Sequence, residues 1–131
     1  MAEADTSPVP TPAVALGEGL TSTPEFAAAF DYVREGKGHL FVTGRAGTGK
    51  STLLRALRDQ LKAELVVLAP TGLAATNVGG QTIHSFFGLP PRLVRSEDIR
   101  RSRNGRVMRK LDLIVIDEVS MVRSDLMWAM D

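Results

Sequence analysis

The chain has 131 residues, with 16 basic and 15 acidic side chains for a net charge of +1, and it contains no cysteine. Its length suits a single domain or less, and its near-neutral charge indicates no class of partner. The absence of cysteine excludes disulfides and thiolate metal sites, as is typical of proteins in a reducing cytoplasm. No segment approaches the roughly 18 apolar residues that a membrane span requires. We therefore expect a cytoplasmic protein, nucleoid-associated if bacterial, that is not secreted.

Residues 1–22 form a tail rich in proline, alanine and threonine. Such a composition buries too little apolar surface to offset the entropy of ordering, so the tail is predicted to be disordered. No lysine or arginine precedes Arg34, and no apolar run has the length of a signal-peptide core. Folded structure is expected over residues 23–131.

Beyond the tail, helical and strand patterns alternate. Apolar residues at helical spacing predict helices, and short apolar runs predict buried strands. The predicted helices cover 25–39, 51–64, 73–78 and 122–130, the last capped by Ser124. The predicted strands cover 39–44, 65–69 and 111–117. This alternation predicts an α/β fold with a parallel sheet flanked by helices. Met121, Met127 and Trp128 are expected on the inner face of the last helix.

The segment "GRAGTGKS", 44–51, matches the phosphate-binding pattern G-x-x-x-x-G-K-[ST] between a predicted strand and a predicted helix. Its glycines let backbone N–H groups converge on phosphate oxygens at a helix N-terminus. Lys50 would bridge the β- and γ-phosphates, and Ser51 would coordinate Mg²⁺. A glycine-rich turn without a ligand is the alternative. The nucleotide-contacting residues are expected to be Gly44, Ala46, Gly47, Thr48, Gly49, Lys50, Ser51 and Thr52.

The run "LIVIDE" ends the third predicted strand in two acids. Ligands of open α/β sheets gather at the carboxyl ends of the strands, where Asp117 would hold Mg²⁺. Glu118 would orient or deprotonate the attacking water. A strand that merely ends in two acids is the alternative. Together with the phosphate loop, the pattern indicates a nucleoside triphosphatase.

The stretch "PTGLAATNVGGQTIHSFFGLP", 70–90, has no charged side chain other than a protonated His84. Thr71 is positioned to cap a short helix, and Thr82, Ser85 and His84 supply hydroxyls and an imidazole. Such groups grip nucleic-acid phosphates without reading sequence, and an aromatic ring stacks on an unpaired base. At least one of Phe86 and Phe87 is expected in the core. His84 could instead be a core histidine.

Three segments, "GRAGTGKSTLL", "APTGLAATNVGGQTIHSFFGLP" and "LIVIDEVSMVRSDLMWAMD", closely resemble the petite-integration-frequency (PIF) family of DNA helicases, in the RecD-like branch of superfamily 1. The resemblance covers about residues 23–131. It implies a RecA-like fold of the P-loop class and an ATP- and Mg²⁺-dependent motor. Such a motor moves 5′-to-3′ on single-stranded DNA, unwinds duplexes at junctions, and serves repair, recombination or telomere maintenance.

Carried over by position, the resemblance implies that Lys50, Asp117 and Glu118 are catalytic and that Ser51 and Asp117 hold the metal. It also implies DNA contacts by Thr71, Gly72, Thr82, His84 and Ser85. Many members of the family carry a glutamine before the phosphate loop that reads adenine. This chain has no glutamine there, so ATP as the nucleotide is implied by the resemblance alone. The family's γ-phosphate-sensing glutamine, second RecA-like domain and arginine finger have no counterpart in these 131 residues. We accordingly expect an incomplete sheet and a polypeptide that does not unwind DNA alone.

Two alternatives remain open from the sequence. One is a non-enzymatic fragment that binds nucleotide or DNA weakly, and the other is an AAA-type ATPase that DNA does not drive. The segment 91–110 carries eight basic side chains against two acidic ones. It is either a solvated linker or a source of further phosphate contacts.

Overall fold

The computed structural model describes residues 23–44, 49–99 and 104–131. The chain divides into two units, Met1–Leu61 and Lys62–Asp131. The predicted disordered tail lies outside the described residues, as do Ala46, Gly47 and Thr48 and part of the basic segment. Among the described helices, none is long and apolar enough to cross a membrane.

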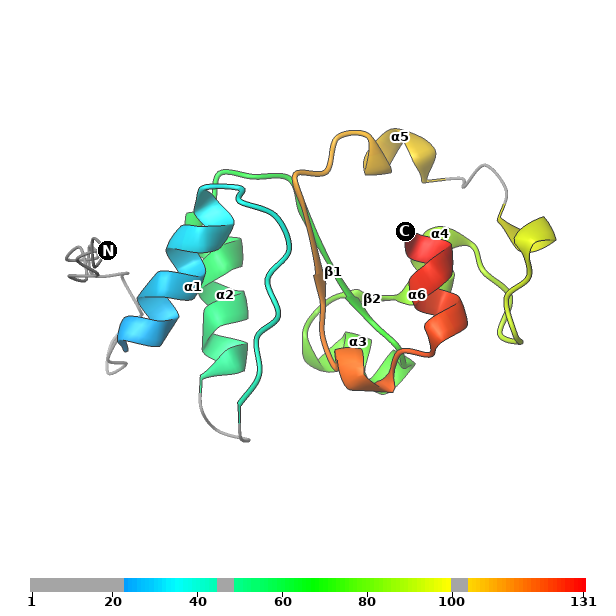
Figure 1. The fold of residues 1–131 in the computed structure, drawn as a ribbon, viewed down its shortest axis with the longest axis horizontal. Coiled ribbons are helices and arrows are strands. Elements are labelled where there is room, and N and C mark those ends of the chain that lie inside the picture. The colour runs from blue at the N-terminus through cyan, green and yellow to red at the C-terminus, as the bar shows by residue number, and fades with distance from the viewer. Residues whose placement is uncertain (1–22, 45–48, 100–103) are drawn as a thin grey trace, which may run out of the picture. The chain divides into compact units, whose positions relative to one another are not determined.

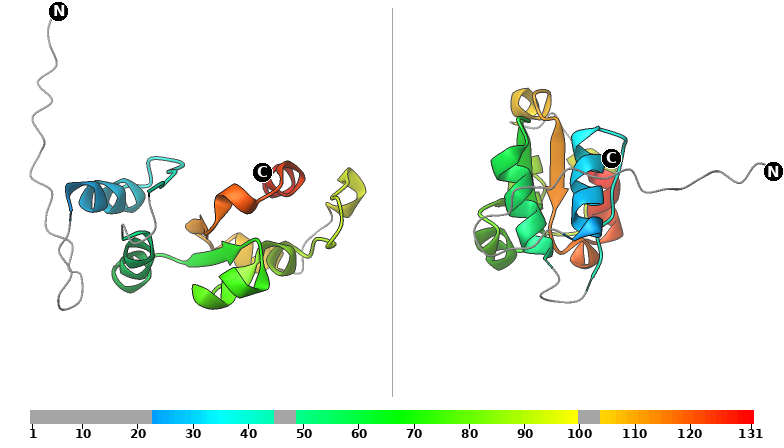
Figure 2. Two further views of the ribbon diagram at one scale, coloured as in Figure 1. Left: turned by 90° about the horizontal axis from the view of Figure 1, so that it is seen from below. Right: turned by 90° about the vertical axis from the view of Figure 1, so that its left-hand side faces the viewer.

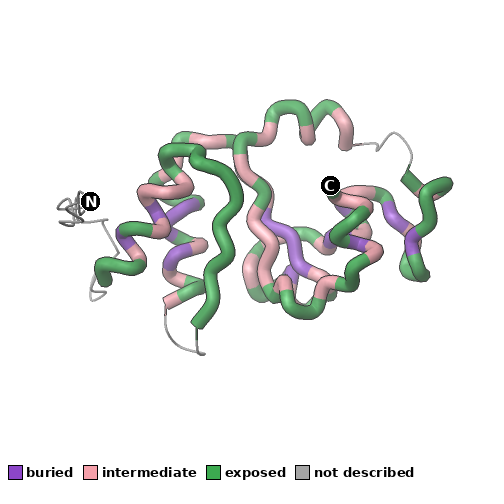
Figure 3. The backbone as a smooth tube through the Cα atoms, in the orientation of Figure 1, coloured by how far each residue is buried: buried purple, intermediate pink, exposed green. Residues whose placement is uncertain are grey.

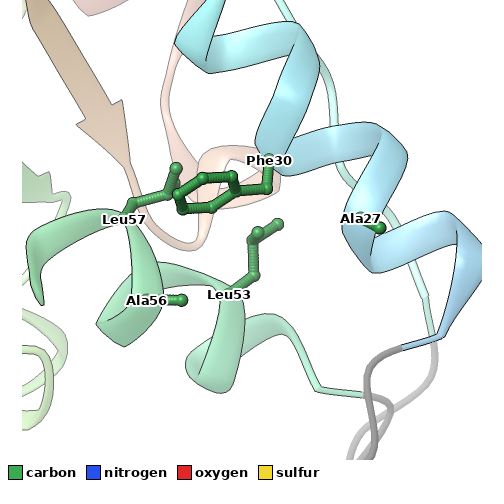
Figure 4. Packing of buried hydrophobic residues seen from close by; sticks show 5 residues of the cluster. All are labelled: Ala27, Phe30, Leu53, Ala56 and Leu57. Atoms are coloured by element: carbon green, nitrogen blue, oxygen red, sulfur yellow. The ribbon is translucent and has the colours of Figure 1, made fainter. Parts of the chain in front are cut away.

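The first unit is a pair of helices, α1 (Pro24–Arg34) and α2 (Lys50–Gln60) (Figure 1). The Thr23 hydroxyl accepts a hydrogen bond from the Phe26 N–H at 3.2 Å, which caps α1 beside the helix-favouring Pro24. The two helices bury a common apolar cluster of Ala27, Phe30, Leu53, Ala56 and Leu57 (Figure 4). Both helices end a few residues before their predicted limits, α2 because Leu61 turns to an extended conformation.

The predicted strand over 39–44 is not formed. These residues have no regular structure, and the Phe41 side chain is 71% exposed. Figure 3 shows the segment as a continuous exposed stretch. A β-strand satisfies its backbone groups only beside another strand. Since the described part of the first unit contains no strand, apolar sequence alone does not make this segment one.

The second unit contains a three-stranded parallel sheet in the order β2-β1-β3. Strand β1 (Leu65–Ala69) lies between β2 (Gln81–Thr82) and β3 (Leu113–Ile116), and it matches its predicted bounds. The third strand is shorter than predicted. Just before it, the Asp112 side chain accepts from the Glu64 N–H at 3.0 Å and the Asp112 N–H donates to the Glu64 carbonyl at 2.8 Å. The mixed α/β class with a parallel sheet is confirmed.

Short helices surround this sheet. Helix α3 (Gly72–Asn77) connects β1 to β2, and α4 (Ile83–Phe87) follows β2 directly. In the left-hand view of Figure 2, α3 lies on one side of β1 and α6 (Ser124–Met130) on the other. The remaining elements are η1 (Ser96–Asp98), α5 (Gly105–Met108) and η2 (Val119–Met121). The core centres on Leu68, Ile83 and Phe86.

Helix α6 departs from its prediction in two ways. Ser124 is its first residue rather than its cap; the cap position belongs to Arg123, which makes no side-chain cap bond with any described residue. Met121, Met127 and Trp128 are also exposed, Trp128 by 55%, instead of facing inward. Only Leu126 of this helix is buried, against Leu89 and Val94. Leu126, Ala129 and Met130 lie on one face of the helix and pack against the core, so Met127 and Trp128 on the other face extend into solvent.

Candidate nucleotide and DNA site

The phosphate loop joins the extended segment at Gly44 to the start of α2. Gly49 occupies the helix cap position with φ 99°, a conformation that favours glycine, and within the described residues it has no side-chain cap bond. Lys50 and Ser51 form the first turn of α2 and are exposed. The backbone N–H groups of a first turn have no partners within the helix, so this terminus suits an anion.

The ammonium of Lys50 donates a hydrogen bond to the carbonyl oxygen of Gly44. This contact joins the two ends of the loop, because Gly44 comes before residues 45–48 and Lys50 comes after them. The lysine charge is thereby held at the loop, next to the first turn of α2. Gly44, Gly49, Lys50, Ser51 and the half-buried Thr52 are thus grouped at one end of the helix.

Asp117 and Glu118 follow β3 in the second unit. The Asp117 N–H donates to the carbonyl of Leu68 at 2.9 Å, which extends the β1–β3 pairing by one residue and leaves the carboxylate partly exposed. Glu118 is exposed and adopts a left-handed backbone with φ 53°, the one positive φ outside glycine in the described residues. Its carbonyl accepts from the Met121 N–H at 3.0 Å as the chain enters η2. Non-glycine residues in this conformation store strain and cluster at functional sites.

Thr71 and Thr82 both act as helix caps. Their hydroxyl oxygens accept hydrogen bonds from the N–H groups of Ala74 and Ser85 at 3.2 and 3.1 Å. The predicted cap at Thr71 is confirmed. That at Thr82 was not foreseen, although a threonine three residues before Ser85 carries the signal for one. Each hydroxyl keeps its proton for a further partner.

The parallel sheet brings these caps to the same edge as the acids. Ala69, two residues before Thr71, aligns with Thr82 on β2, and Leu68 aligns with Ile116 on β3. Asp117 and Thr82 therefore lie at one level on the two strands that flank β1, a separation of two strand spacings, about 10 Å. The second unit thus gathers Thr71, Thr82 and the acids at the carboxyl edge of its sheet.

The remaining residues of the predicted DNA motif differ in exposure. Gly72 and Ser85 are exposed, whereas His84 is half-buried. The Nε2 atom of His84 is shielded from solvent and has no hydrogen-bond partner among the described residues. Phe86 is buried and meets Phe87 edge-to-face, with ring centroids 5.1 Å apart, which confirms that one phenylalanine belongs to the core.

Part of the basic segment 91–110 takes part in ion pairs within the fold. Arg92 forms a two-pronged ion pair with Asp98, each contact at 2.7 Å. The side-chain hydrogen bond from Arg92 is the largest effect that lowers the pKa of Asp98. Sequence analysis missed this pair because an arginine and an aspartate six residues apart in a loop follow no recognisable pattern.

The contacts of Asp125 were also not predicted from the sequence. Asp125 accepts from the Val94 N–H at 2.8 Å and pairs with Arg123, whose Nη2 also donates to the Arg92 carbonyl at 3.0 Å. The Arg123 hydrogen bond is the main cause of the lowered pKa of Asp125. These contacts fasten the loop after α4 to the start of α6.

The residues expected at the metal site suit Mg²⁺ chemically. Ser51 offers a hydroxyl in the first unit, and Asp117 offers a carboxylate in the second. Across the described ranges no three His, Cys, Asp or Glu side chains gather into a metal-binding group. Mg²⁺ needs no such group, because it commonly takes one or two protein oxygens together with waters and substrate phosphates.

Residues 23–131 match the family of PIF1-like helicases. The chain belongs to this family. The ATP-dependent DNA helicase Pif1 of Bdellovibrio bacteriovorus is 42% identical over 106 residues, which cover 76% of this chain and 24% of that protein. The chain therefore spans about a quarter of that PIF1-like relative.

Solved Pif1 helicases share the fold. A Bacteroides sp. Pif1 in complex with ADP-AlF4 has a TM-score of 0.77 and 36% identity, over 86% of this chain and 27% of the other. A Bacteroides Pif1 bound to single-stranded DNA has a TM-score of 0.75 and 36% identity over the same shares. The expected family and its RecA-like α/β fold are thereby confirmed.

Proposed function

We propose that this chain supplies the ATP-binding part and some DNA contacts of a helicase that moves 5′-to-3′ along single-stranded DNA. Its membership in the PIF1-like family carries the proposal. Two further observations support it: similar Pif1 helicases have been crystallised with ADP-AlF4 and with single-stranded DNA. The shared sheet edge of Thr71, Thr82 and Asp117 agrees with it, since DNA motif and acid meet there.

Lys50 and Ser51 are assigned to the phosphates of ATP. The Lys50 ammonium neutralises charge that develops on the transferred phosphoryl group, and the first-turn N–H groups of α2 bind its oxygens. Ser51 and Asp117 are the residues that would hold Mg²⁺, an ion that takes few protein oxygens and completes its shell with waters and substrate phosphates. Glu118 accepts a hydrogen bond from the attacking water and orients it. Ala46, Gly47, Thr48 and Thr52 complete the proposed phosphate contacts.

The DNA strand is assigned to the edge formed by Thr71, Gly72, Thr82 and Ser85. The Thr71 and Thr82 hydroxyls donate to phosphate oxygens while their own oxygens continue to cap α3 and α4, and the exposed Ser85 hydroxyl donates beside them. His84 contributes to the same surface. Contacts of this kind bind any sequence, which suits a motor that advances along DNA. Duplex junctions are the proposed site of unwinding.

By family, DNA repair, recombination and, in eukaryotes, telomere maintenance are the proposed processes. The proposed location is cytoplasmic, with association to the nucleoid if the chain is bacterial.

Binding of single-stranded DNA tests the proposal. Fluorescence anisotropy of a labelled oligothymidine, titrated with the purified chain, is expected to show saturable binding that exceeds binding to a blunt duplex of equal length. Affinity should fall as salt rises, because phosphate contacts release counterions. A chain that binds neither probe, or that prefers the blunt duplex, would overturn the proposed function.

A further inference from the structure

Gly80 lies against the backbone of the central strand. A Cβ atom added to it would stand 2.3 Å from the Val67 carbonyl oxygen and 3.0 Å from the Val67 carbonyl carbon. Real Cβ contacts are essentially never shorter than 3.0 Å. Both contacted atoms belong to the backbone of a buried strand, so neither can swing away as a flexible side chain would. Any residue with a side chain must therefore move β2, β1 or both.

The position of Gly80 is fixed from both directions along the chain. On its N-terminal side, α3 ends in a paired turn, in which the Gly80 N–H donates to Ala75 at 2.8 Å and the Gly79 N–H to Thr76 at 3.1 Å. On its C-terminal side, Gln81 pairs with Leu68 at once. The close approach to Val67 thus fixes the path of the backbone from the end of α3 to the start of β2.

The two helix caps lie on either side of this approach. Thr71 follows β1 and begins α3, whereas Thr82 ends β2 and begins α4. Only two residue pairs join β2 to β1, compared with four between β1 and β3. A displacement at residue 80 would consequently shift Thr82 and α4 away from Thr71. The longer β1–β3 pairing, which carries Asp117, would resist it.

We infer that Gly80 is a positioning residue for DNA binding. Its missing side chain lets β2 lie against β1, and this sets the spacing between the Thr71 and Thr82 ends of the DNA-contacting edge. The inference deepens the proposed function and rests on it. Among the described glycines given a trial Cβ, Gly80 alone meets backbone closer than 3.0 Å.

Gly80→Ala tests the inference, with Gly105→Ala as the matched control. Gly105 lies in α5, and a Cβ there meets nothing within 4 Å. Each variant is titrated with labelled oligothymidine at a temperature well below its melting transition, and with a fluorescent ATP analogue. Gly80→Ala is expected to lose affinity for oligothymidine about tenfold or more. Its affinity for the nucleotide should stay within about twofold, because the proposed phosphate contacts lie in the first unit and the β1–β3 pairing that carries Asp117 is the longer one. Gly105→Ala should match the unaltered chain in both titrations.

The outcomes separate the two claims. If the unaltered chain fails to bind oligothymidine, the proposed function fails and this inference with it. If the unaltered chain binds and folded Gly80→Ala binds equally well, the positioning role alone is overturned, even where the melting temperature has dropped.

If Gly80→Ala fails to fold, hydrogen–deuterium exchange on the unaltered chain, with and without oligothymidine, tests the positioning role instead. DNA is expected to protect the peptides containing 71–76 and 81–88 together, because Gly80 holds them as one surface. Protection of only one of them would contradict the inference.

Discussion

The backbone N–H of Asp117 donates to the carbonyl oxygen of Leu68 at 2.9 Å. Leu68 is fully buried and aligns with Gln81 on its other side, immediately before Thr82. One residue of the central strand therefore adjoins the strands that carry the proposed metal ligand and the proposed DNA contact. A displacement of β2 or β3 would disturb the backbone pairing at Leu68. Strand β1 is therefore the element that fixes the position of β2 relative to β3.

Replacement of Leu68 by alanine is expected to destabilise the second unit strongly. Loss of a fully buried leucine leaves a cavity and costs about 2–5 kcal/mol. Leu73→Ala is the matched control, since Leu73 is 76% exposed and its removal leaves no cavity. Urea denaturation followed by circular dichroism measures both. Equal effects of the two substitutions would contradict the assigned core.

Glu118 offers a test of stored strain. Glu118→Gly relieves the left-handed backbone but adds freedom to the unfolded chain, so we expect stability to be unchanged or to rise by about 1 kcal/mol. Glu118→Gln keeps the backbone cost and should leave stability within about 0.5 kcal/mol. Both variants should lose any ATP hydrolysis that the chain supports. A Glu118→Gly variant that unfolds more easily than Glu118→Gln would refute the strain argument.

The Thr82 hydroxyl should stabilise α4 as a cap. Thr82→Val keeps the shape but removes the acceptor for the Ser85 N–H, and loss of such a cap costs about 1 kcal/mol. Thr82→Ser retains an acceptor and should lie close to the unaltered chain. Thermal melts of the two variants provide the comparison. If valine and serine proved equally stable, the capping bond would contribute nothing measurable.

The ion pairs of Asp98 and Asp125 predict a loss of stability in acid. Both carboxyls have a lowered pKa in the folded chain, mainly because Arg92 and Arg123 respectively donate hydrogen bonds to them. A lowered folded pKa gives stability that is complete above the unfolded value of about 3.9 and is lost as pH falls through the folded pKa. The melting temperature should thus decline below about pH 4.

Asn substitutions provide the control for this acid limb. Asp98→Asn and Asp125→Asn should each start from a lower melting temperature at neutral pH and then show a shallower fall. A variant that combines Asp98→Asn with Asp125→Asn should lose less melting temperature in acid than the unaltered chain; an equally steep loss would show that other carboxyls cause it.

Sequence predicted the parts of this molecule whose signals are local. Strand β1, the stripe of Leu53 and Leu57 on α2, and the Thr71 cap all follow from residues within one or two turns of each other. The same holds for the parallel sheet, because alternating helices and strands restrict its topology. The phosphate-loop pattern likewise located the Lys50 turn of α2.

What sequence missed depends on partners far along the chain. The segment 39–44 has the composition of a strand but finds no strand beside it in the described part of its unit. The two-residue β2 exists because Gly80 lets the chain approach Val67, a contact between residues thirteen apart. The bond from Val94 to Asp125 joins residues separated by thirty-one, and no local pattern encodes it.

Binding of a fluorescent ATP analogue, with and without Mg²⁺, most directly tests the central claim that this chain carries the nucleotide site of a PIF1-like helicase. The unaltered chain is compared with Lys50→Ala and with Lys62→Ala, which removes an exposed lysine beyond α2. We predict saturable, Mg²⁺-dependent binding that Lys50→Ala weakens by about tenfold or more and Lys62→Ala leaves unchanged. Absence of saturable binding in the unaltered chain, or equal affinity in Lys50→Ala, would contradict the account.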